Sequence, residues 1–174
     1  MKKIIVFLVC IIAISCSNDD DNDPQLQTNN FLEVNGEEYD LKLGTIENLG
    51  SYEGSIFDFV LNLSSSNFTF NDGFTFEDDI VTSISIDLYV NNPNDLVIGD
   101  YPKVSFDDIS GNSFQAMDLL INYDIANENG TTKQIVEGTL TVLNVGNEYE
   151  LEFSGIDNDG LNVNFYYKGE LVEM

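Results

Sequence analysis

The chain has 174 residues, of which 31 are Asp or Glu and six are Lys, and it contains no Arg, His or Trp. A chain of this length normally folds as one domain, and its 12 Phe and 8 Tyr provide apolar surface for a core. The absence of His excludes Ser-His-Asp and Cys-His catalysis and every imidazole metal site, and the formal charge of −25 opposes binding to nucleic acid.

The first residues have the pattern of a bacterial export signal. Lys2 and Lys3 are followed by eleven mostly apolar residues, 4–14, and then by Ser15 and Cys16. Eleven residues are too few to cross a bilayer as a helix, which takes about 17–25 residues. The segment therefore predicts a secretory signal rather than a membrane span.

The small residue before Cys16 resembles the lipobox of bacterial lipoproteins. In those proteins the signal is removed before the Cys, whose sulfur receives a diacylglyceryl group and whose new amine is acylated. The resemblance implies that residues 1–15 are a cleaved signal peptide and that Cys16 is the lipid anchor. Two or more acyl chains make membrane residence stable, because each buried CH₂ adds about 0.8 kcal/mol. An ordinary secretory signal, with Cys16 incidental, is the alternative; in both cases Cys10 is lost and no internal disulfide is expected.

Residues 16–30 have the composition of an acidic, flexible tether without apolar periodicity. The residues directly behind the Cys are Ser17, Asn18, Asp19, Asp20 and Asp21. This order resembles the export signal of Bacteroidota lipoproteins, in which acids behind the lipidated Cys send the protein to the outer face of the outer membrane. The resemblance implies a lipid-anchored outer-membrane protein that faces the cell exterior. The alternative is a solvated spacer that holds the domain away from either leaflet.

From Phe31 to Met174, apolar and polar residues alternate with period two, which predicts half-buried antiparallel strands. The apolar members of the clearest runs are Phe57, Phe59, Leu61 and Leu63; Ile84, Ile86, Leu88 and Val90; Met117, Leu119, Ile121 and Tyr123; Leu140 and Val142; Tyr149, Leu151 and Phe153; and Leu161, Val163, Phe165 and Tyr167. The residues between them are mostly Asp, Glu, Asn and Ser, so one face of each strand is expected to face water. No stretch has a helical stripe with caps.

Turn residues separate these runs and predict hairpins. Asn35-Gly36 fits a two-residue type I′ turn, whose central residues need positive φ, and further turns are expected at Asn129-Gly130, at Gly146-Asn147 and within 157–160. We therefore predict that residues 31–174 form one all-β domain. It would be an antiparallel meander of about eight to ten strands, closed as a lipocalin-like β-barrel or packed as a β-sandwich, because both architectures predict the same alternation.

Residues 138–171 and 96–101 resemble closing hairpins and a strand exit of small all-β domains in Bacteroidota lipoproteins. This resemblance lies in spacing and supports the fold. It carries no catalytic motif and therefore implies no activity.

Carboxylates are the only plentiful reactive groups. A glycosidase needs two of them about 5–9.5 Å apart, one in a hydrophobic cleft that raises its pKa. The acids here alternate along strands or lie in turns, so we expect no catalytic residues and no enzyme, with an acidic-pair hydrolase as the alternative.

Two acid-rich loops have the oxygen ligands that Ca²⁺ prefers. They are Asp157-Asn158-Asp159-Gly160, and Asn71-Asp72-Gly73 with Glu77, Asp78 and Asp79. Neither matches an EF-hand loop, because Gly160 at loop position six would place Gly155 at position one. We therefore expect hairpin turns, with no metal and no cofactor.

Aromatic residues supply further candidates. Tyr166 and Tyr167 are adjacent, so in a strand they face opposite sides. Tyr167 falls in the apolar register and is expected in the core, whereas Tyr166 is expected to point outward, within reach of a ligand. Four Phe residues flank the turn at 71–73 and are expected on the core side of a hairpin: Phe68, Phe70, Phe74 and Phe76. If that hairpin projects, they would form an apolar patch for a partner.

These patterns predict a non-enzymatic, surface-anchored lipoprotein whose β-domain binds a small apolar ligand, a glycan or a protein partner. The alternative is an accessory or structural subunit that docks on an outer-membrane transporter or secretion complex. A closed barrel with a cavity of about 300–1,000 Å³ would favour the small ligand, and an exposed Phe patch would favour docking.

Overall fold

A computed structural model of the chain describes residues 29–70 and 74–174. Apart from a single 3₁₀ turn at Phe106–Asp108, all the regular structure in these residues is β-strand. The strands are β1 (Phe31–Val34), β2 (Glu37–Asp40), β3 (Leu43–Glu53), β4 (Ile56–Ser64), β5 (Phe68–Phe70), β6 (Phe74–Phe76), β7 (Ile80–Val90), β8 (Gly99–Pro102), β9 (Ser113–Asp124), β10 (Asn129–Asn144), β11 (Tyr149–Asp157), β12 (Asn162–Gly169) and β13 (Leu171–Glu173). None of these residues forms a helix with the length and apolar character of a membrane span. The predicted all-β fold is confirmed.

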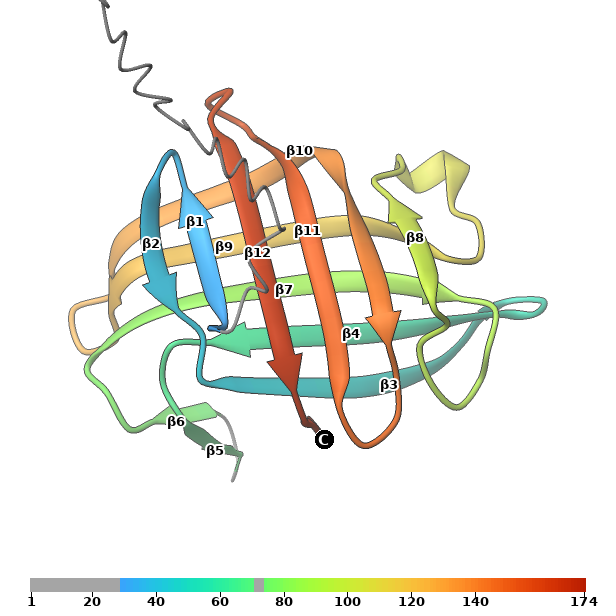
Figure 1. The fold of residues 1–174 in the computed structure, drawn as a ribbon, viewed down its shortest axis with the longest axis horizontal. Coiled ribbons are helices and arrows are strands. Elements are labelled where there is room, and N and C mark those ends of the chain that lie inside the picture. Colours follow the sequence, from blue (N-terminus) through green and yellow to red (C-terminus); the bar gives the residue numbers. More distant parts are fainter. Residues whose placement is uncertain (1–28, 71–73) are drawn as a thin grey trace, which may run out of the picture.

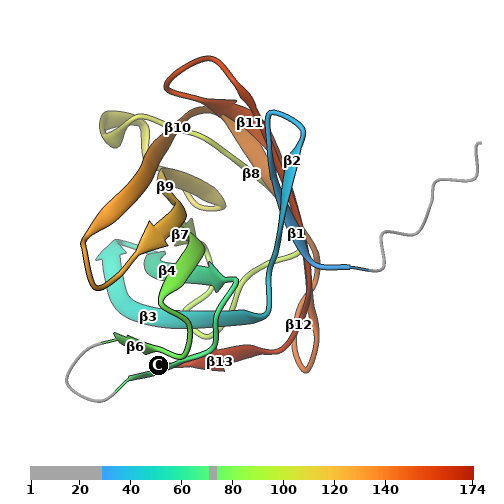
Figure 2. The ribbon, with the colours of Figure 1, turned by 90° about the vertical axis from the view of Figure 1, so that its left-hand side faces the viewer.

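Eleven of these strands belong to one curled sheet, in the order β13-β3-β4-β7-β9-β10-β11-β12-β1-β2, with β8 paired to β10. In Figure 1, β3, β4, β7 and β9 run across the back of the molecule, and β1, β11 and β12 cross in front of them. Figure 2 shows the curl of the sheet from the side. We call β13, β3, β4, β7, β9 and the start of β10 the back layer. The front layer comprises β8, the rest of β10, β11, β12, β1 and β2.

The sheet turns from one layer to the other along β10. Residues 129–134 of this strand pair with β9, whereas the residues from Ile135 onward pair with β11. On the other edge of β10, residues 99–102 of β8 take the place of β9. A register shift between Ile135 and Glu137 lies at this change of partners. Such bulges bend a strand and increase its twist, which accounts for the curl at this point.

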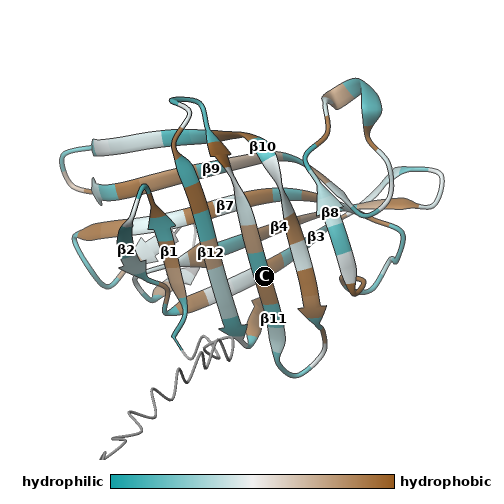
Figure 3. Cartoon of the chain, turned by 45° about the horizontal axis from the view of Figure 1, so that its top comes forward, coloured by the Kyte–Doolittle hydropathy of each residue, from teal (hydrophilic) through white to brown (hydrophobic). Residues whose placement is uncertain are grey.

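The core lies between the inner faces of the two layers. Of the apolar residues in the predicted runs, all except Phe57, Tyr123 and Leu161 are buried, and apolar and polar colours alternate along the strands in Figure 3. The ring of Phe153 in β11 stacks on Phe165 with centroids 5.5 Å apart and meets Phe114 of β9 edge-on at 6.0 Å. These aromatic contacts join the front layer to the back layer.

The prediction of a single antiparallel meander of about eight to ten strands is wrong in two respects. There are 13 strands in the described residues, among them the short strands β5, β6, β8 and β13. The first strand, β1, pairs with β12 near the end of the chain, and β13 pairs with β3 in parallel. In the described residues, the sheet path ends at β13 and β2 without a pairing between them, so the sheet is a curled half-barrel. Strands of three or four residues are too short to produce a clear alternation, which explains why the sequence pattern predicts fewer strands than the structure contains.

Most predicted turns are confirmed. Asn35 and Gly36 have φ values of 52° and 85°, as a type I′ turn requires. The turn placed at Asn129-Gly130 is wrong, because the chain reverses at 125–128 and both residues already belong to β10. A Cβ atom on Gly130 would lie 2.6 Å from the Cα of Tyr123, so this glycine allows two strands to approach closely.

Candidate functional site

The predicted anchor and export residues lie outside the described residues. They are Cys16, Ser17, Asn18, Asp19, Asp20 and Asp21. The turn Asn71-Asp72-Gly73 also lies outside them.

The loop 157–160 is a turn whose central carboxylate is already occupied. The side chain of Asp157 is fully buried, and its Oδ1 accepts hydrogen bonds from the backbone N–H groups of Asp159 at 2.9 Å and Leu161 at 2.8 Å. Its Oδ2 lies 3.4 Å from the Lys133 ammonium, which also contacts Asp159. Burial by itself would raise the pKa of the Asp157 carboxyl, but these hydrogen bonds and the Lys133 charge outweigh it and lower the pKa.

This geometry is that of a stabilised turn, as predicted, in which the Asp157 carboxylate contacts two backbone N–H groups and the Lys133 ammonium. Within residues 29–70 and 74–174, no group of three or more Asp, Glu or Cys side chains is arranged to hold a metal ion.

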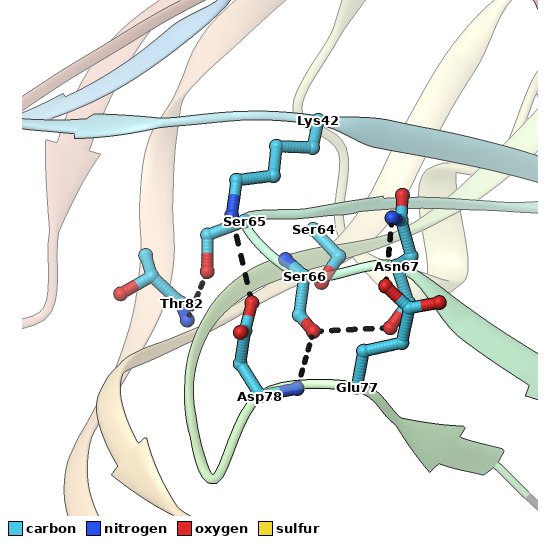
Figure 4. A network of polar contacts seen from close by, with 8 residues as sticks. All are labelled: Lys42, Ser64, Ser65, Ser66, Asn67, Glu77, Asp78 and Thr82. Atoms are coloured by element: carbon cyan, nitrogen blue, oxygen red, sulfur yellow. Dashed lines mark hydrogen bonds and ion pairs between the residues drawn. The ribbon is translucent and has the colours of Figure 1, made fainter.

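Glu77 and Asp78 hold the base of the β5–β6 hairpin. Glu77 accepts a hydrogen bond from the Asn67 amide at 2.9 Å, and Asp78 lies 3.5 Å from the Lys42 ammonium. Figure 4 shows these contacts among the serines that precede the hairpin. Both acids therefore have a structural role, and Asp79 is exposed beside them.

The hairpin itself is a separate two-stranded sheet. The rings of Phe68 and Phe76 meet edge-on with centroids 5.4 Å apart and are half-buried, and neither belongs to the core. Their expected core position is therefore wrong. The chain leaves β4 through a run of polar residues, 64–67, which form hydrogen bonds of their own and place the hairpin outside the curled sheet.

A groove of about 410 Å³ lies on the outer face of the front layer. We call it the front groove; it is lined by Phe31, Thr139, Thr141, Glu152, Phe153, Ser154, Asn164, Phe165 and Tyr166. Strand register arranges the outward side chains in two neighbouring rows. The first row is Phe31, Tyr166, Glu152 and Thr141, and the second is Glu33, Asn164, Ser154 and Thr139. Each row crosses four strands and spans about 14 Å, because paired strands lie about 4.8 Å apart.

Tyr166 is fixed in the wall of this groove. Its hydroxyl donates to Oε1 of Glu150 at 2.9 Å, and the other oxygen of Glu150 lies 3.1 Å from the Lys168 ammonium. Burial, together with the hydrogen bond to Glu150, raises the pKa of Tyr166 to about 12, so its hydroxyl stays protonated and donates. The hydrogen bond from Tyr166 and the contact with Lys168 lower the pKa of Glu150.

The register confirms that Tyr166 faces outward and that Tyr167 lies in the core. However, Tyr166 is only 6% exposed, so its ring forms a wall rather than a free platform. Phe31 stands directly opposite it on β1 and provides the second aromatic side chain.

The chemistry of the front groove suits a neutral ligand with many hydroxyl groups. The hydroxyls of Thr139 and Ser154 and the amide of Asn164 can each donate and accept hydrogen bonds, whereas the Thr141 hydroxyl donates to Oδ1 of Asp100 at 2.9 Å and offers a ligand only its oxygen as an acceptor. Anions are disfavoured by Glu152 and by the formal charge of −25.

A row of carboxylates crosses the outer face of the back layer. Asp58, Asp87 and Asp118 are diagonal neighbours on β4, β7 and β9. Burial raises the pKa of Asp58 and of Asp87, and repulsion from the next carboxylate in the row raises each further. Oδ1 of Asp58 is buried and has no hydrogen-bond partner in the part of the chain that the structure describes. None of these acids lines the front groove.

Sequence reasoning identified Tyr166 but missed the residues around it. Phe31, Thr139, Glu152 and Asn164 meet only because β1 pairs with β12 and β11 lies between β12 and β10. The available signal was the set of polar residues between the apolar positions of three adjacent strands.

No protein-family model matches the chain, and neither the curated proteins nor the solved structures contain a match.

Proposed function

We propose that this chain is a non-enzymatic lipoprotein, held at the outer membrane through Cys16, whose β-domain binds a neutral glycan in the front groove. The observation that carries the ligand proposal is the pair of rows across four strands, one with Phe31 and Tyr166 and the other with hydroxyl and amide groups. Aromatic side chains can cover the apolar face of a sugar ring, while the polar row forms hydrogen bonds with its hydroxyls.

Other ligand classes receive less support from the described residues. A small apolar ligand inside a barrel needs a lumen, but large buried rings such as Phe59, Phe114 and Phe165 occupy the space between the layers. We interpret the curled sheet as a β-sandwich with crossed strands rather than as a closed barrel, because no pairing in the described residues joins β2 to β13.

Affinity electrophoresis of the purified chain in gels that contain one polysaccharide each tests the ligand proposal. The probes are the neutral polymers laminarin, xyloglucan, mannan, dextran and starch, with polygalacturonate as the anionic control. We expect at least one neutral polymer to retard the chain and polygalacturonate to have no effect. Tyr166→Ala and Asn164→Ala should each weaken binding about tenfold, which corresponds to the loss of about 1.4 kcal/mol.

The matched control is Tyr52→Ala, which removes an exposed Tyr from β3 in the other layer. It should bind as the unaltered chain does. Glycan binding is contradicted if no neutral polymer retards the chain, or if the groove variants and the control lose affinity equally.

Membrane anchoring is tested by Cys16→Ala, with Cys10→Ala as the matched control. The first variant should be released in soluble, folded form, because it lacks the acylated sulfur. The second should fractionate with membranes, because it keeps the small residue and the Cys of the lipobox. Membrane association of the Cys16→Ala variant would contradict acyl anchoring.

The outward location is tested by adding proteinase to intact cells, which should degrade the β-domain. Replacing Asp19, Asp20 and Asp21 by Ala should protect it, because the acids behind the Cys would no longer direct export. Full protection of the unaltered chain would contradict display on the exterior.

Capture of the intact protein from its outer membrane tests the alternative of an accessory subunit. Recovery of a transporter or secretion component in equal amounts, unchanged by Tyr166→Ala, would favour docking over glycan binding.

A further inference from the structure

The front groove is longer across the strands than along them. Its outward side chains come from β1, β12, β11 and β10, which lie side by side in Figure 1. Four strands span about 14 Å, whereas the two rows lie two residues apart along each strand, which is about 7 Å. A chain-like ligand that fills the groove therefore runs across the strands, and the width admits a single chain.

The polar row of the groove is accessible and unused. Asn164, Ser154 and Thr139 stand on three successive strands, and each is at least partly exposed. No hydrogen bond joins their side chains to any other residue that the structure describes. From β12 to β10, each strand thus offers a ligand one free polar side chain, and these groups repeat every 4.8 Å or so, the distance of about one strand spacing.

The other row is aromatic at one end and polar at the other. Phe31 on β1 and Tyr166 on β12 are followed by Glu152 on β11. Glu152 is exposed, and its carboxylate forms no hydrogen bond or ion pair within residues 29–70 and 74–174. A carboxylate with both oxygens free can accept hydrogen bonds from two neighbouring hydroxyls of one sugar ring. A ligand that crosses the groove therefore meets the aromatic rings first and hydrogen-bonding groups after them.

Carboxylates also stand at both ends of this row. Register continues it from Phe31 to Asp40 on β2, and from Thr141 to Asp100 on β8. Both acids are exposed. Together with Glu152, they would present a like charge to an anionic polymer at the start, the middle and the end of the row. The groove is therefore suited to a polymer whose backbone is uncharged.

We propose that the ligand of the front groove is a linear, neutral, β-1,4-linked polysaccharide that lies across β1, β12, β11 and β10. This inference rests on the proposed function and narrows its ligand class. Equatorial linkages keep such a chain extended, so each ring advances it by roughly the distance between paired strands, about 4.8 Å, and about three rings fit the groove. Chains with α-1,4 or β-1,3 linkages curve, so fewer of their rings stay over the two rows.

Isothermal titration calorimetry of the purified full chain tests this inference with oligosaccharides from the disaccharide to the hexasaccharide. The β-1,4-linked series are manno-, cello- and xylo-oligosaccharides, and the controls are malto-oligosaccharides (α-1,4) and laminari-oligosaccharides (β-1,3). In at least one β-1,4-linked series, we expect affinity to rise up to about three rings and then to level off. Both control series should bind at least about tenfold more weakly. Oligosaccharides of β-1,4-linked mannuronate, which differ from the manno series by a carboxylate on each ring, should not bind.

The direction of the chain is tested by Thr139→Val, which removes a hydroxyl at the end of the groove away from the aromatic rings. It should weaken the tetrasaccharide about fivefold, the loss of one hydrogen bond, and leave the disaccharide unchanged, because the shorter ligand stays beside Phe31 and Tyr166. Phe31→Ala should weaken both lengths. Thr132→Val, which alters an exposed threonine of the same strand outside the groove, is the matched control and should change neither.

The possible failures separate this inference from the proposed function. If the malto- or laminari-oligosaccharides bind as tightly as every β-1,4-linked series, the linkage is wrong although glycan binding stands. A chain across the strands is contradicted if affinity does not change with length, or if Thr139→Val has the same effect on the disaccharide and the tetrasaccharide. If no oligosaccharide of any series binds and no neutral polymer retards the chain in gels, both the inference and the proposed glycan binding are wrong.

Discussion

Folding shifts the pKa values of carboxylates on the outer faces of the two layers in opposite directions. In the front layer, Glu150 shares its two oxygens between the Tyr166 hydroxyl and the Lys168 ammonium, and its pKa is lowered. In the back layer, Asp58 and Asp87 lie beside further carboxylates, and their pKa values are raised. Both faces arise from the same alternation of polar and apolar residues. The position of a few lysines therefore decides whether an acid on the sheet stabilises the fold or opposes it.

This difference predicts opposite contributions to stability as the pH changes. A carboxyl whose pKa is lowered by folding contributes stability above its unfolded pKa, and that stability is lost as the pH falls through the folded value. A carboxyl whose pKa is raised by folding opposes the native state at neutral pH and ceases to do so once it is protonated. Acid should therefore remove a stabilising contribution from the front layer and relieve a destabilising one in the back layer.

The largest expected effect is on the core, which the two layers share. Leu61 in the back layer and Leu151 in the front layer are both 0% exposed. Replacing either by Ala should lower the free energy of unfolding by about 2–5 kcal/mol, because each change removes buried apolar contacts and leaves a cavity. Denaturant unfolding followed by tyrosine fluorescence and by circular dichroism should give one coincident transition for each variant. Two separate transitions would contradict a single core.

A second prediction concerns Asp157, an acid whose carboxylate faces a lysine. In Asp157→Asn, an NH₂ group can replace Oδ2 and face the Lys133 ammonium, so we expect a loss of about 1.5–3 kcal/mol at pH 7. Because folding lowers the pKa of Asp157, the difference between the unaltered chain and the variant should shrink as the pH falls below about 4. Urea unfolding at several pH values measures this. A difference that is constant with pH would contradict a contribution from the charge.

The sequence predicts the inner faces well and the outer faces poorly. The alternation identifies residues such as Leu61 and Ile86 as core, because one buried face is enough to produce it. The front groove depends instead on pairing between β1 and β12, which lie far apart in the chain, and alternation contains no information about which strands pair. Likewise, the turn 157–160 is visible in its Asn, Asp and Gly residues, but the Lys133 that faces Asp157 is not.

A third prediction concerns the hydroxyl of Thr45 in the back layer, which has no hydrogen-bond partner among the described residues. Thr45→Val should raise the free energy of unfolding by about 1 kcal/mol, because a valine methyl group has no hydrogen bond to lose in this buried place. Thr139→Val, in the front groove, should change stability by less than about 0.5 kcal/mol. Urea unfolding of both variants without added ligand makes the comparison, and a destabilised Thr45→Val would show that the hydroxyl has a partner in solution.

The smallest expected effect, and the one that tests the comparison most directly, is that of Asp87→Asn. Asp87 lies between Asp58 and Asp118, so Asp87→Asn removes the charge that repels both neighbouring carboxylates. At pH 7 we expect the variant to be more stable by about 0.2–1 kcal/mol, the range for like charges on neighbouring strands. Because folding raises the pKa of Asp87, the unaltered chain should recover this difference as the pH falls and the carboxyl binds a proton.

The control is Asp107→Asn, which removes the same charge from an exposed residue of the 3₁₀ turn. If it stabilised the chain as much as Asp87→Asn does, the effect would come from the net charge of the whole chain rather than from the row. If only Asp87→Asn does so, and its advantage disappears in acid while the disadvantage of Asp157→Asn also disappears, then acids that face a lysine and acids that face one another contribute to stability with opposite sign. The same acidic composition would then stabilise the fold where a lysine faces an acid and oppose it where acids face one another, according to where the four lysines of the β-domain are placed.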